Sequence, residues 1–402
     1  MSPRVAAVET GCDRLLSDPS GLVGRPYALL THAASIDRRA RPLHQALADS
    51  AAGPPRALFS PEHGYYGVEQ DMIPSDDAVD PLSGIPILSL YGEGEHTLVP
   101  APEAFAGLEV LVVDLQDVGS RYYTYAATAI WAARVALEAG LEVWVLDRPN
   151  PLGGAQVEGP PVDPGFDSFV GAFDWPVRHG LTLAELVRLE AQRGGWQSEG
   201  LRFWTMTGWN PRAHFDGTGL PWVAPSPNMP TLATARVYPG GCLIEGTALS
   251  EGRGTTRPFE LVGAPEVDPK SLVTTLEGAG LAGVRLVPTF FKPQFQKHAG
   301  RTCGGVQVLV SDPQVFEPLR CGVELLAALR WQMGDAFAWR AEAYEFVTDR
   351  PAIDLLAGGP VLRRALDAGD RPALDDWIAG WARHSEQFAE ASRAIHLYPR
   401  TG

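Results

Sequence analysis

The stretch Val110-Leu-Val-Val-Asp-Leu-Gln-Asp117 is an apolar run that changes abruptly to polar residues. Three other stretches in the first half share this design: Ala28-Leu-Leu-Thr-His32, Ala57-Leu-Phe-Ser-Pro-Glu-His63 and Val143-Trp-Val-Leu-Asp-Arg-Pro-Asn150. Their hydrophobicity is continuous and does not alternate, which is typical of strands that are buried on both faces. They therefore predict four strands of one parallel sheet.

Helices are expected between these strands. The clearest helical pattern runs from about Tyr125 to Ala139, with Gly140 as the residue that ends the helix. A later helix is predicted from Thr182 to about Arg193, because Thr182 and Glu185 have the spacing of a capping box. Strands that alternate with helices indicate an α/β fold with a parallel sheet. In such sheets ligands bind at the carboxyl ends of the strands, where each of these runs becomes polar.

The second half of the chain has a different texture. Proline and glycine are frequent from Trp209 to Pro230, which predicts a long loop and a domain boundary near residue 228. We expect a first domain over 1–228 and a smaller α+β domain over 229–402. For the second domain the pattern predicts strands at 283–287 and 306–310 and helices at 323–332 and 375–394.

Composition and charge exclude several classes of protein. The 402 residues are 45% hydrophobic and 20% charged, which is incompatible with a disordered chain. The net charge of −15 repels nucleic acids and anionic membrane surfaces. The four cysteines have no CxxC spacing, so we expect reduced thiols and no zinc or redox site. No export signal and no membrane-length apolar run is visible, which predicts a cytoplasmic protein.

The first candidate site is Ser60-Pro-Glu-His-Gly64, at a predicted strand end. Glu62 suits a general acid whose pKa burial raises, and with His63 it suits half of a metal site. A loop glutamate that caps a backbone N–H group is an equally good interpretation of Glu62. The metal interpretation is the weaker one, because no HExxH or HxH spacing accompanies it.

The second candidate site is the stretch from Asp114 to Tyr125. Its carboxylate, amide and guanidinium groups are typical of hydroxyl recognition, and tyrosine rings offer faces on which a sugar packs. The helical spacing of Tyr122 and Tyr125 favours core positions for those two. The candidates in this stretch are Asp114, Gln116, Asp117, Arg121, Tyr122 and Tyr123.

Two further stretches carry polar side chains. Asp147, Arg148 and Asn150 follow another strand, where a structural role is a serious alternative. The glycine-rich stretch from Glu245 to Thr256 lets backbone amides approach a ligand, or forms a simple hairpin. Its candidates, with a preceding loop residue and a lysine further on, are Asn228, Glu245, Ser250, Glu251, Arg253 and Lys297.

Several enzyme motifs are missing from the sequence. It contains no GxSxG nucleophile elbow, no GxGxxG dinucleotide fingerprint and no phosphate-binding GxxxxGK[ST] loop. We therefore expect no cofactor and no resident metal. A cleft lined by carboxylates, Arg, Asn, Gln and Tyr suits a small carbohydrate.

Taken in order, the strings SPEHG, DLQDVGSRYYTY, DRPNPLGG, HGLTLAEL, WVAPSPNMPT and YPGGCLIEGTALSEGRGTTRPFE resemble the NamZ-type exo-β-N-acetylmuramidases. The resemblance runs from about residue 25 to about residue 330. It implies a Rossmann-like domain, a smaller second domain and an active site in the cleft between them. The implied activity is removal of β-1,4-linked N-acetylmuramic acid from the non-reducing end of peptidoglycan fragments. The chain has Thr31-His32 where relatives typically read TN, and it lacks the export signal of many relatives, which fits intracellular recycling of wall fragments.

The resemblance also implies roles for single residues. Glu62 corresponds to the family's glutamate and is the expected general acid, with Asp114 and Asp117 as candidates for a second acid-base or orienting role. Retaining, inverting and substrate-assisted mechanisms all stay open, because a sequence does not give the distance between two carboxyl groups. The lactyl carboxylate of muramic acid calls for arginine, so Arg253 and then Arg121 are nominated.

Two other functions are compatible with the same cleft. One is a non-catalytic protein that binds muropeptides. The other is a metal-assisted hydrolase built on Glu62, His63, Asp114 and Asp147. Activity on a muraminide would exclude the first, and full activity after chelation would exclude the second.

Overall fold

The computed structural model describes residues 7–70 and 72–400. Its larger sheet has seven strands in the order β3-β4-β2-β1-β5-β6-β7. All neighbouring strands are parallel except β3 and β4. The bounds are β1 Tyr27–Thr31, β2 Leu58–Ser60, β3 Ala78–Val79, β4 Pro86–Ser89, β5 Val110–Asp114, β6 Glu142–Leu146 and β7 Leu201–Trp204.

The four predicted strands are confirmed as β1, β2, β5 and β6. Successive residues of β5 face opposite layers, as expected for a strand that is covered on both sides. Leu111 and Val113 pack in the core shared with α3 and α4, and Val110 and Val112 pack in the core shared with α1 and α2. These helices span Gly11–Ser17 (α1), Leu43–Ala48 (α2), Tyr125–Glu138 (α3) and Leu183–Arg193 (α4).

The local signals for α3 and α4 are confirmed as well. Thr182 and Glu185 form the capping box at the start of α4. Beyond the last residue of α3, Gly140 has a φ of +86°, a left-handed conformation that glycine adopts without strain. The four cysteines are all buried and free.

The second half contains a three-stranded antiparallel sheet of order β8-β10-β9 covered by helices. Its strands are β8 Leu261–Ala264, β9 Val284–Phe291 and β10 Cys303–Val310. Its helices are α5 Leu232–Gly241, α6 Pro269–Glu277, α7 Pro318–Met333, α8 Ala352–Ala357, α9 Val361–Ala368 and α10 Arg371–Ala391. The predicted α+β class is confirmed, with several corrected boundaries.

Proline and glycine account for most of these corrections. β9 continues past Pro288 because it is an edge strand, where the missing N–H costs no ladder bond. β10 begins three residues before the predicted start, since Gly304 and Gly305 lie inside the strand; a Cβ on Gly305 would lie 2.0 Å from the carbonyl oxygen of Val262. α10 begins at Arg371, four residues early, because Asp370 caps it by accepting from the Ala373 amide.

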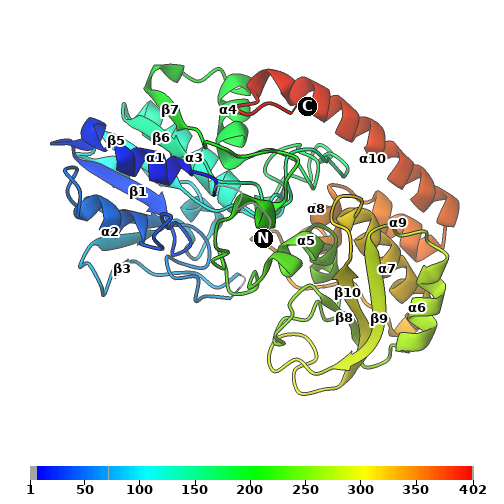
Figure 1. The fold of residues 1–402 in the computed structure, drawn as a ribbon. Coiled ribbons are helices and arrows are strands. Elements are labelled where there is room, and N and C mark those ends of the chain that lie inside the picture. The colour runs from blue at the N-terminus through cyan, green and yellow to red at the C-terminus, as the bar shows by residue number, and fades with distance from the viewer. Residues whose placement is uncertain (1–6, 71, 401–402) are drawn as a thin grey trace, which may run out of the picture.

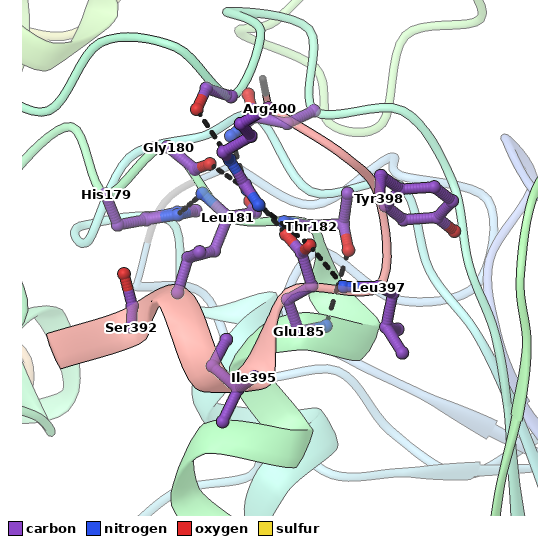
Figure 2. Close-up of polar contacts among 12 residues, drawn as sticks. His179, Gly180, Leu181, Thr182, Glu185, Ser392, Ile395, Leu397, Tyr398 and Arg400 are labelled. Atoms are coloured by element: carbon purple, nitrogen blue, oxygen red, sulfur yellow. Dashed lines mark hydrogen bonds and ion pairs between the residues drawn. The ribbon is translucent and has the colours of Figure 1, made fainter. Parts of the chain in front are cut away.

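The last residues of the chain return to the first half. α10 runs along one side of the molecule and leads the chain from the smaller sheet back to α4 (Figure 1). There the Tyr398 hydroxyl donates to Asp147 at 2.6 Å, and Arg400 Nη2 lies 2.8 Å from a Glu185 oxygen. The Leu397 amide also donates to Glu185, as Figure 2 shows. The boundary near residue 228 stays a prediction, and residues 397–400 belong in space to the larger sheet.

Two predictions concern the location of the protein. Within residues 7–70 and 72–400, no helix is both long and apolar enough to cross a membrane. The prediction about an export signal rests on the first residues, of which 1–6 lie outside the described part. The predicted cytoplasmic location stays a prediction.

The C-terminal contact makes a testable contribution to stability. Burial, with the nearby Glu185 carboxylate, raises the pKa of Asp147 to about 7, against the hydrogen bonds from Tyr398 and Thr182. An unfolded aspartate titrates near pH 4, so this group stabilises the fold fully only below about pH 4 and loses that contribution as the pH rises through about 7. We therefore expect the free energy of unfolding to fall less between about pH 5 and pH 8 in Asp147→Asn than in the wild type. Denaturant titrations at both pH values measure this free energy. An equal decrease in the variant and the wild type would contradict the prediction.

Candidate active site

A cavity lies between the larger sheet and the second half of the chain. Its volume is about 40 Å³, which is room for water and not for a sugar ring. The carboxyl end of β2 and the start of α3 form one wall, and the region after α5 forms the other. The residues around it are Glu62, His63, Tyr122, Tyr123, Thr124, Val170, Ser226, Asn228, Met229, Tyr238, Glu245, Arg253, Phe259, Tyr344 and Glu345.

Glu62 is buried at the carboxyl end of β2, with 5% of its surface exposed. The Thr124 hydroxyl donates to Glu62 Oε2 at 2.7 Å. The Tyr125 hydroxyl lies within hydrogen-bonding distance of two backbone oxygens, that of Glu62 at 3.2 Å and that of Pro225 at 2.8 Å. The start of α3 therefore positions both the main chain and the carboxyl group of Glu62.

His63 faces the other oxygen of Glu62. Its Nδ1 donates to the Glu69 carbonyl oxygen at 3.0 Å, because a carbonyl only accepts, so a neutral ring carries no proton on Nε2. That Nε2 lies 4.0 Å from Glu62 Oε1. His63, Phe259 and Glu345 have φ values of +71°, +62° and +46°. Strained backbone of this kind clusters at functional sites.

Glu245 and Arg253 form a buried ion pair on the opposite wall. Arg253 Nη2 lies 2.7 Å from Glu245 Oε1, and the Tyr344 hydroxyl donates to Glu245 Oε2 at 2.7 Å. Burial alone would raise the pKa of Glu245, but Arg253, Tyr344 and Lys297 outweigh it and hold that pKa below its usual value. Glu245 is therefore an ionised carboxylate at neutral pH.

Glu251, Lys297 and Ser250 lie behind this ion pair and do not line the cavity. Glu251 accepts from Lys297 Nζ at 2.9 Å and approaches Arg253 Nε at 3.4 Å. Lys297 Nζ also donates to the Glu245 carbonyl oxygen at 3.3 Å. Ser250 Oγ accepts from the Gly252 amide. These three predicted binding residues hold the loop that carries Arg253.

Asp114 and Arg148 were expected in the ligand site, but in the structure they bind each other. Arg148 donates to both carboxylate oxygens of Asp114, at 2.5 and 2.8 Å, and to the Ile36 carbonyl oxygen. Neither side chain lines the cavity. This buried pair joins the ends of β5 and β6, so the structure gives Asp114 a structural partner where an acid-base role was predicted.

Gln116, Asp117 and Asn150 also hold loops together. The Gln116 side chain donates to the Pro149 carbonyl oxygen at 3.0 Å, and the Gln116 backbone N–H donates to His32 Nε2 at 3.0 Å. Asp117 accepts from the Gly119 amide, and Asn150 donates to the Leu181 carbonyl oxygen at 2.9 Å. Burial lowers the pKa of His32 to about 3, so His32 is neutral and has a structural role. It belongs to the Thr31-His32 pair, at which this chain differs from its relatives.

Arg121 and Asp147 are bound elsewhere as well. Arg121 donates to the carbonyl oxygens of Pro160, Trp175 and Leu356, which uses its guanidinium to join the first half to α8. Asp147 accepts from Thr182 and Tyr398 at the C-terminal contact. Neither residue lines the cavity.

The predicted residues that the fold does bring to the cavity come from both halves of the chain. They are Glu62, His63, Tyr122, Tyr123, Asn228, Glu245 and Arg253. Within the described part of the chain, the buried Tyr122 hydroxyl has no hydrogen-bond partner, which suits a group that meets a ligand. The Asn228 side chain donates to the Gln70 side chain at 2.7 Å.

Sequence reasoning missed several lining residues. Thr124 lay inside a quoted motif, and its position at the start of a predicted helix was the available signal. Tyr344 and Glu345 stand in a stretch with no motif, and only the fold brings them opposite Glu62. Among the described residues, no group of three or more His, Cys, Asp or Glu is arranged to hold a metal ion. Of the four residues in the metal interpretation, Glu62 and His63 lie close together. Asp114 is paired with Arg148, and Asp147 accepts from Tyr398.

Comparisons with known proteins agree with this architecture. The family descriptions "Exo-beta-N-acetylmuramidase NamZ, N-terminal" and "C-terminal" match residues 27–233 and 236–398. The peptidoglycan β-N-acetylmuramidase NamZ of Bacillus subtilis (strain 168) is 37% identical over 392 residues, which cover 97% of this chain and 91% of that protein.

Two solved structures of DUF1343 family proteins from Bacteroides fragilis NCTC 9343 are also similar. The first has a TM-score of 0.86 at 29% identity and covers 99% of this chain and all of its own. The second has a TM-score of 0.76 at 26% identity and covers 98% of this chain and 99% of its own. The resemblance found in the sequence motifs is thus confirmed and extends to residue 398, and the chain belongs to the NamZ family of exo-β-N-acetylmuramidases.

Proposed function

We propose that this protein is an exo-β-N-acetylmuramidase that releases β-1,4-linked N-acetylmuramic acid from the non-reducing end of peptidoglycan fragments. The observation that carries the proposal is Glu62, a buried carboxyl group in a cavity that both halves of the chain line. The name of the Bacillus subtilis relative supports the same substrate.

Glu62 acts as the general acid in this proposal. Thr124 donates to Oε2, so the proton of a neutral Glu62 is carried by Oε1. Oε1 gives this proton to the glycosidic oxygen as the bond to the anomeric carbon breaks, and the leaving sugar departs with a new hydroxyl group. Water supplies the hydroxyl of the released muramic acid, and its second proton restores Glu62.

Negative charge from the opposite wall stabilises the transition state. The sequence pointed to Asp114 and Asp117 for the second carboxyl role, but Glu245 and Glu345 are the carboxyl groups that line the cavity with Glu62. We assign to them the stabilisation of the oxocarbenium-like sugar. Arg253, Tyr344 and Lys297 keep Glu245 ionised at neutral pH.

Arg253 is the proposed partner of the lactyl carboxylate. It lines the cavity, and its guanidinium lies 5.2 Å from the centre of the Phe259 ring. Arg121, the second nominee, has its guanidinium on three carbonyl oxygens and does not line the cavity. Recognition of the lactyl group is what separates a muraminidase from a glucosaminidase.

The test uses two chromogenic substrates, a β-N-acetylmuraminide and the matching β-N-acetylglucosaminide. We expect release of the chromophore from the muraminide and little from the glucosaminide, with the same rate in EDTA. Tight binding of a muropeptide without turnover would favour a binding protein instead. Loss of activity in EDTA that added metal restores would favour metal-assisted hydrolysis.

A further inference from the structure

A second and larger cavity is lined in part by the returning C-terminal segment, whose contacts with residues 179–185 are drawn in Figure 2. Its volume is about 860 Å³, and it shares no lining residue with the active-site cavity. The residues around it are 152–157, 179–181, 211–212, 214, 314, 389, 392–393 and 396–400. A cavity of this size matches the usual range for small-molecule sites.

Its lining is basic, although the chain as a whole carries a net charge of −15. The basic side chains around it are Arg212, Arg393, Arg400, His179, His214 and His396. The lining contributed by residues 7–70 and 72–400 includes no Asp and no Glu. A concave site lined by one sign of charge concentrates ligands of the opposite sign.

The three arginines differ in what holds them. Arg400 is fixed by Glu185 and by the carbonyl oxygens of Gly154 and Gly180, so it forms the wall (Figure 2). Arg393 pairs with Glu390 at the rim. Arg212 is exposed, and its guanidinium makes no hydrogen bond or ion pair within the described ranges. Arg212 is thus a full positive charge that is available to a ligand.

His214 supplies a second polar group, a ring nitrogen that lacks a hydrogen bond within the described residues. It is 7% exposed, and its Nδ1 is buried without a hydrogen-bond partner in the part of the chain that the structure describes. Burial, and then the charges of Arg178 and Arg236, lower the pKa of His214 to about 4. Burial and Arg400 lower the pKa of His396 to about 4 as well. His214 and His396 are therefore neutral at physiological pH, and the positive charge that remains available in the cavity is that of arginine.

We propose that this cavity is a binding site for a small organic anion, whose oxyanion group meets Arg212 and whose body meets the apolar side chains of Leu152, Val157 and Leu181. Guanidinium groups bind carboxylate and phosphate in the same forked geometry, so either group fits this chemistry. The proposal does not depend on the muramidase activity, because none of its residues lines the cavity of Glu62.

Three hexoses that differ in charge test the proposal by isothermal titration calorimetry on the full-length protein. They are glucose 6-phosphate, glucuronate and neutral glucose. We expect millimolar or tighter binding of one or both anions and none of glucose. The two anions distinguish a phosphate site from a carboxylate site. Absence of binding by both anions, or equal binding of glucose, overturns the proposal.

A pair of matched variants locates the binding. Arg212→Ala should weaken binding of the anion about tenfold or more, while the midpoint of thermal unfolding stays unchanged because Arg212 is exposed. Arg285→Ala removes an exposed arginine from β9, outside the lining, and should leave the binding constant unchanged. Equal weakening in both variants would mean general charge attraction and no site. Unchanged binding in Arg212→Ala would place the anion elsewhere.

Discussion

Glu62→Gln is expected to lower kcat on a β-N-acetylmuraminide by about 10²–10⁴-fold, the usual contribution of a general acid. Glutamine keeps the size of the side chain and still accepts the hydrogen bond from Thr124, but it has no proton to give to the leaving oxygen. Substrate binding should change little, so the effect appears in kcat and not in KM. Steady-state kinetics on the purified variants measure both constants.

The matched control is Glu69→Gln, the same change a few residues further along the chain. Its backbone carbonyl accepts from His63, and its side chain does not line the cavity. This variant should retain wild-type kcat. Thr124→Val, which removes the hydroxyl on Glu62 Oε2, should reduce kcat less than Glu62→Gln does. If Glu62→Gln stays within a few-fold of the wild type, Glu62 is not the acid.

Among these substitutions, Glu245→Gln should lower the free energy of unfolding most. The change leaves the Arg253 guanidinium buried, 6% exposed, beside a neutral amide. Removal of one partner of a buried ion pair costs about 3–5 kcal/mol, because the remaining charge loses its compensation. We expect a value at the lower end, since Glu251 lies 3.4 Å from Arg253 Nε. Denaturant titration gives the free energy of unfolding directly.

A double-mutant cycle shows whether this loss of stability arises from the interaction between Glu245 and Arg253. Arg253→Met removes the charge and keeps much of the packing on Phe259. In the double variant Glu245→Gln with Arg253→Met, no buried charge of this pair remains, so the total cost should be clearly smaller than the sum of the single costs. Additive costs would show that Glu245 and Arg253 act independently.

The sequence was sufficient for the parallel sheet and for one wall of the site. Continuous apolar runs identify buried strands, and polar residues at their ends identify the ligand-binding edge. Glu62 and His63, which line the cavity, were predicted in this way. The same rule also selected Asp114 and Arg148, which bind each other. Polar groups at neighbouring strand ends meet either a ligand or one another, and their residue types alone do not distinguish the two cases.

The rest depended on contacts between distant segments. Arg121 carries the charge that a lactyl group requires, but three carbonyl oxygens from different loops surround it. Tyr344 reaches Glu245 across 99 residues of sequence, with no motif around it. α5 contains Pro239, Gly240 and Gly241 in its last turn. Gly240 is there because a Cβ at this position would lie 2.0 Å from the Pro318 carbonyl oxygen, and this close approach holds α5 against α7.

The return of the C-terminal segment has a consequence for biosynthesis. Asp147 and Glu185 emerge from the ribosome early, whereas Tyr398 and Arg400, which bind them, follow 251 and 215 residues later. Until then two carboxyl groups of the sheet domain lack these partners, so this domain reaches its final stability only after residues 397–400 have been made. Contacts this distant in sequence also slow folding, because a long loop must close before they form. We therefore expect the nascent chain to depend on chaperones for longer than a self-contained sheet domain would.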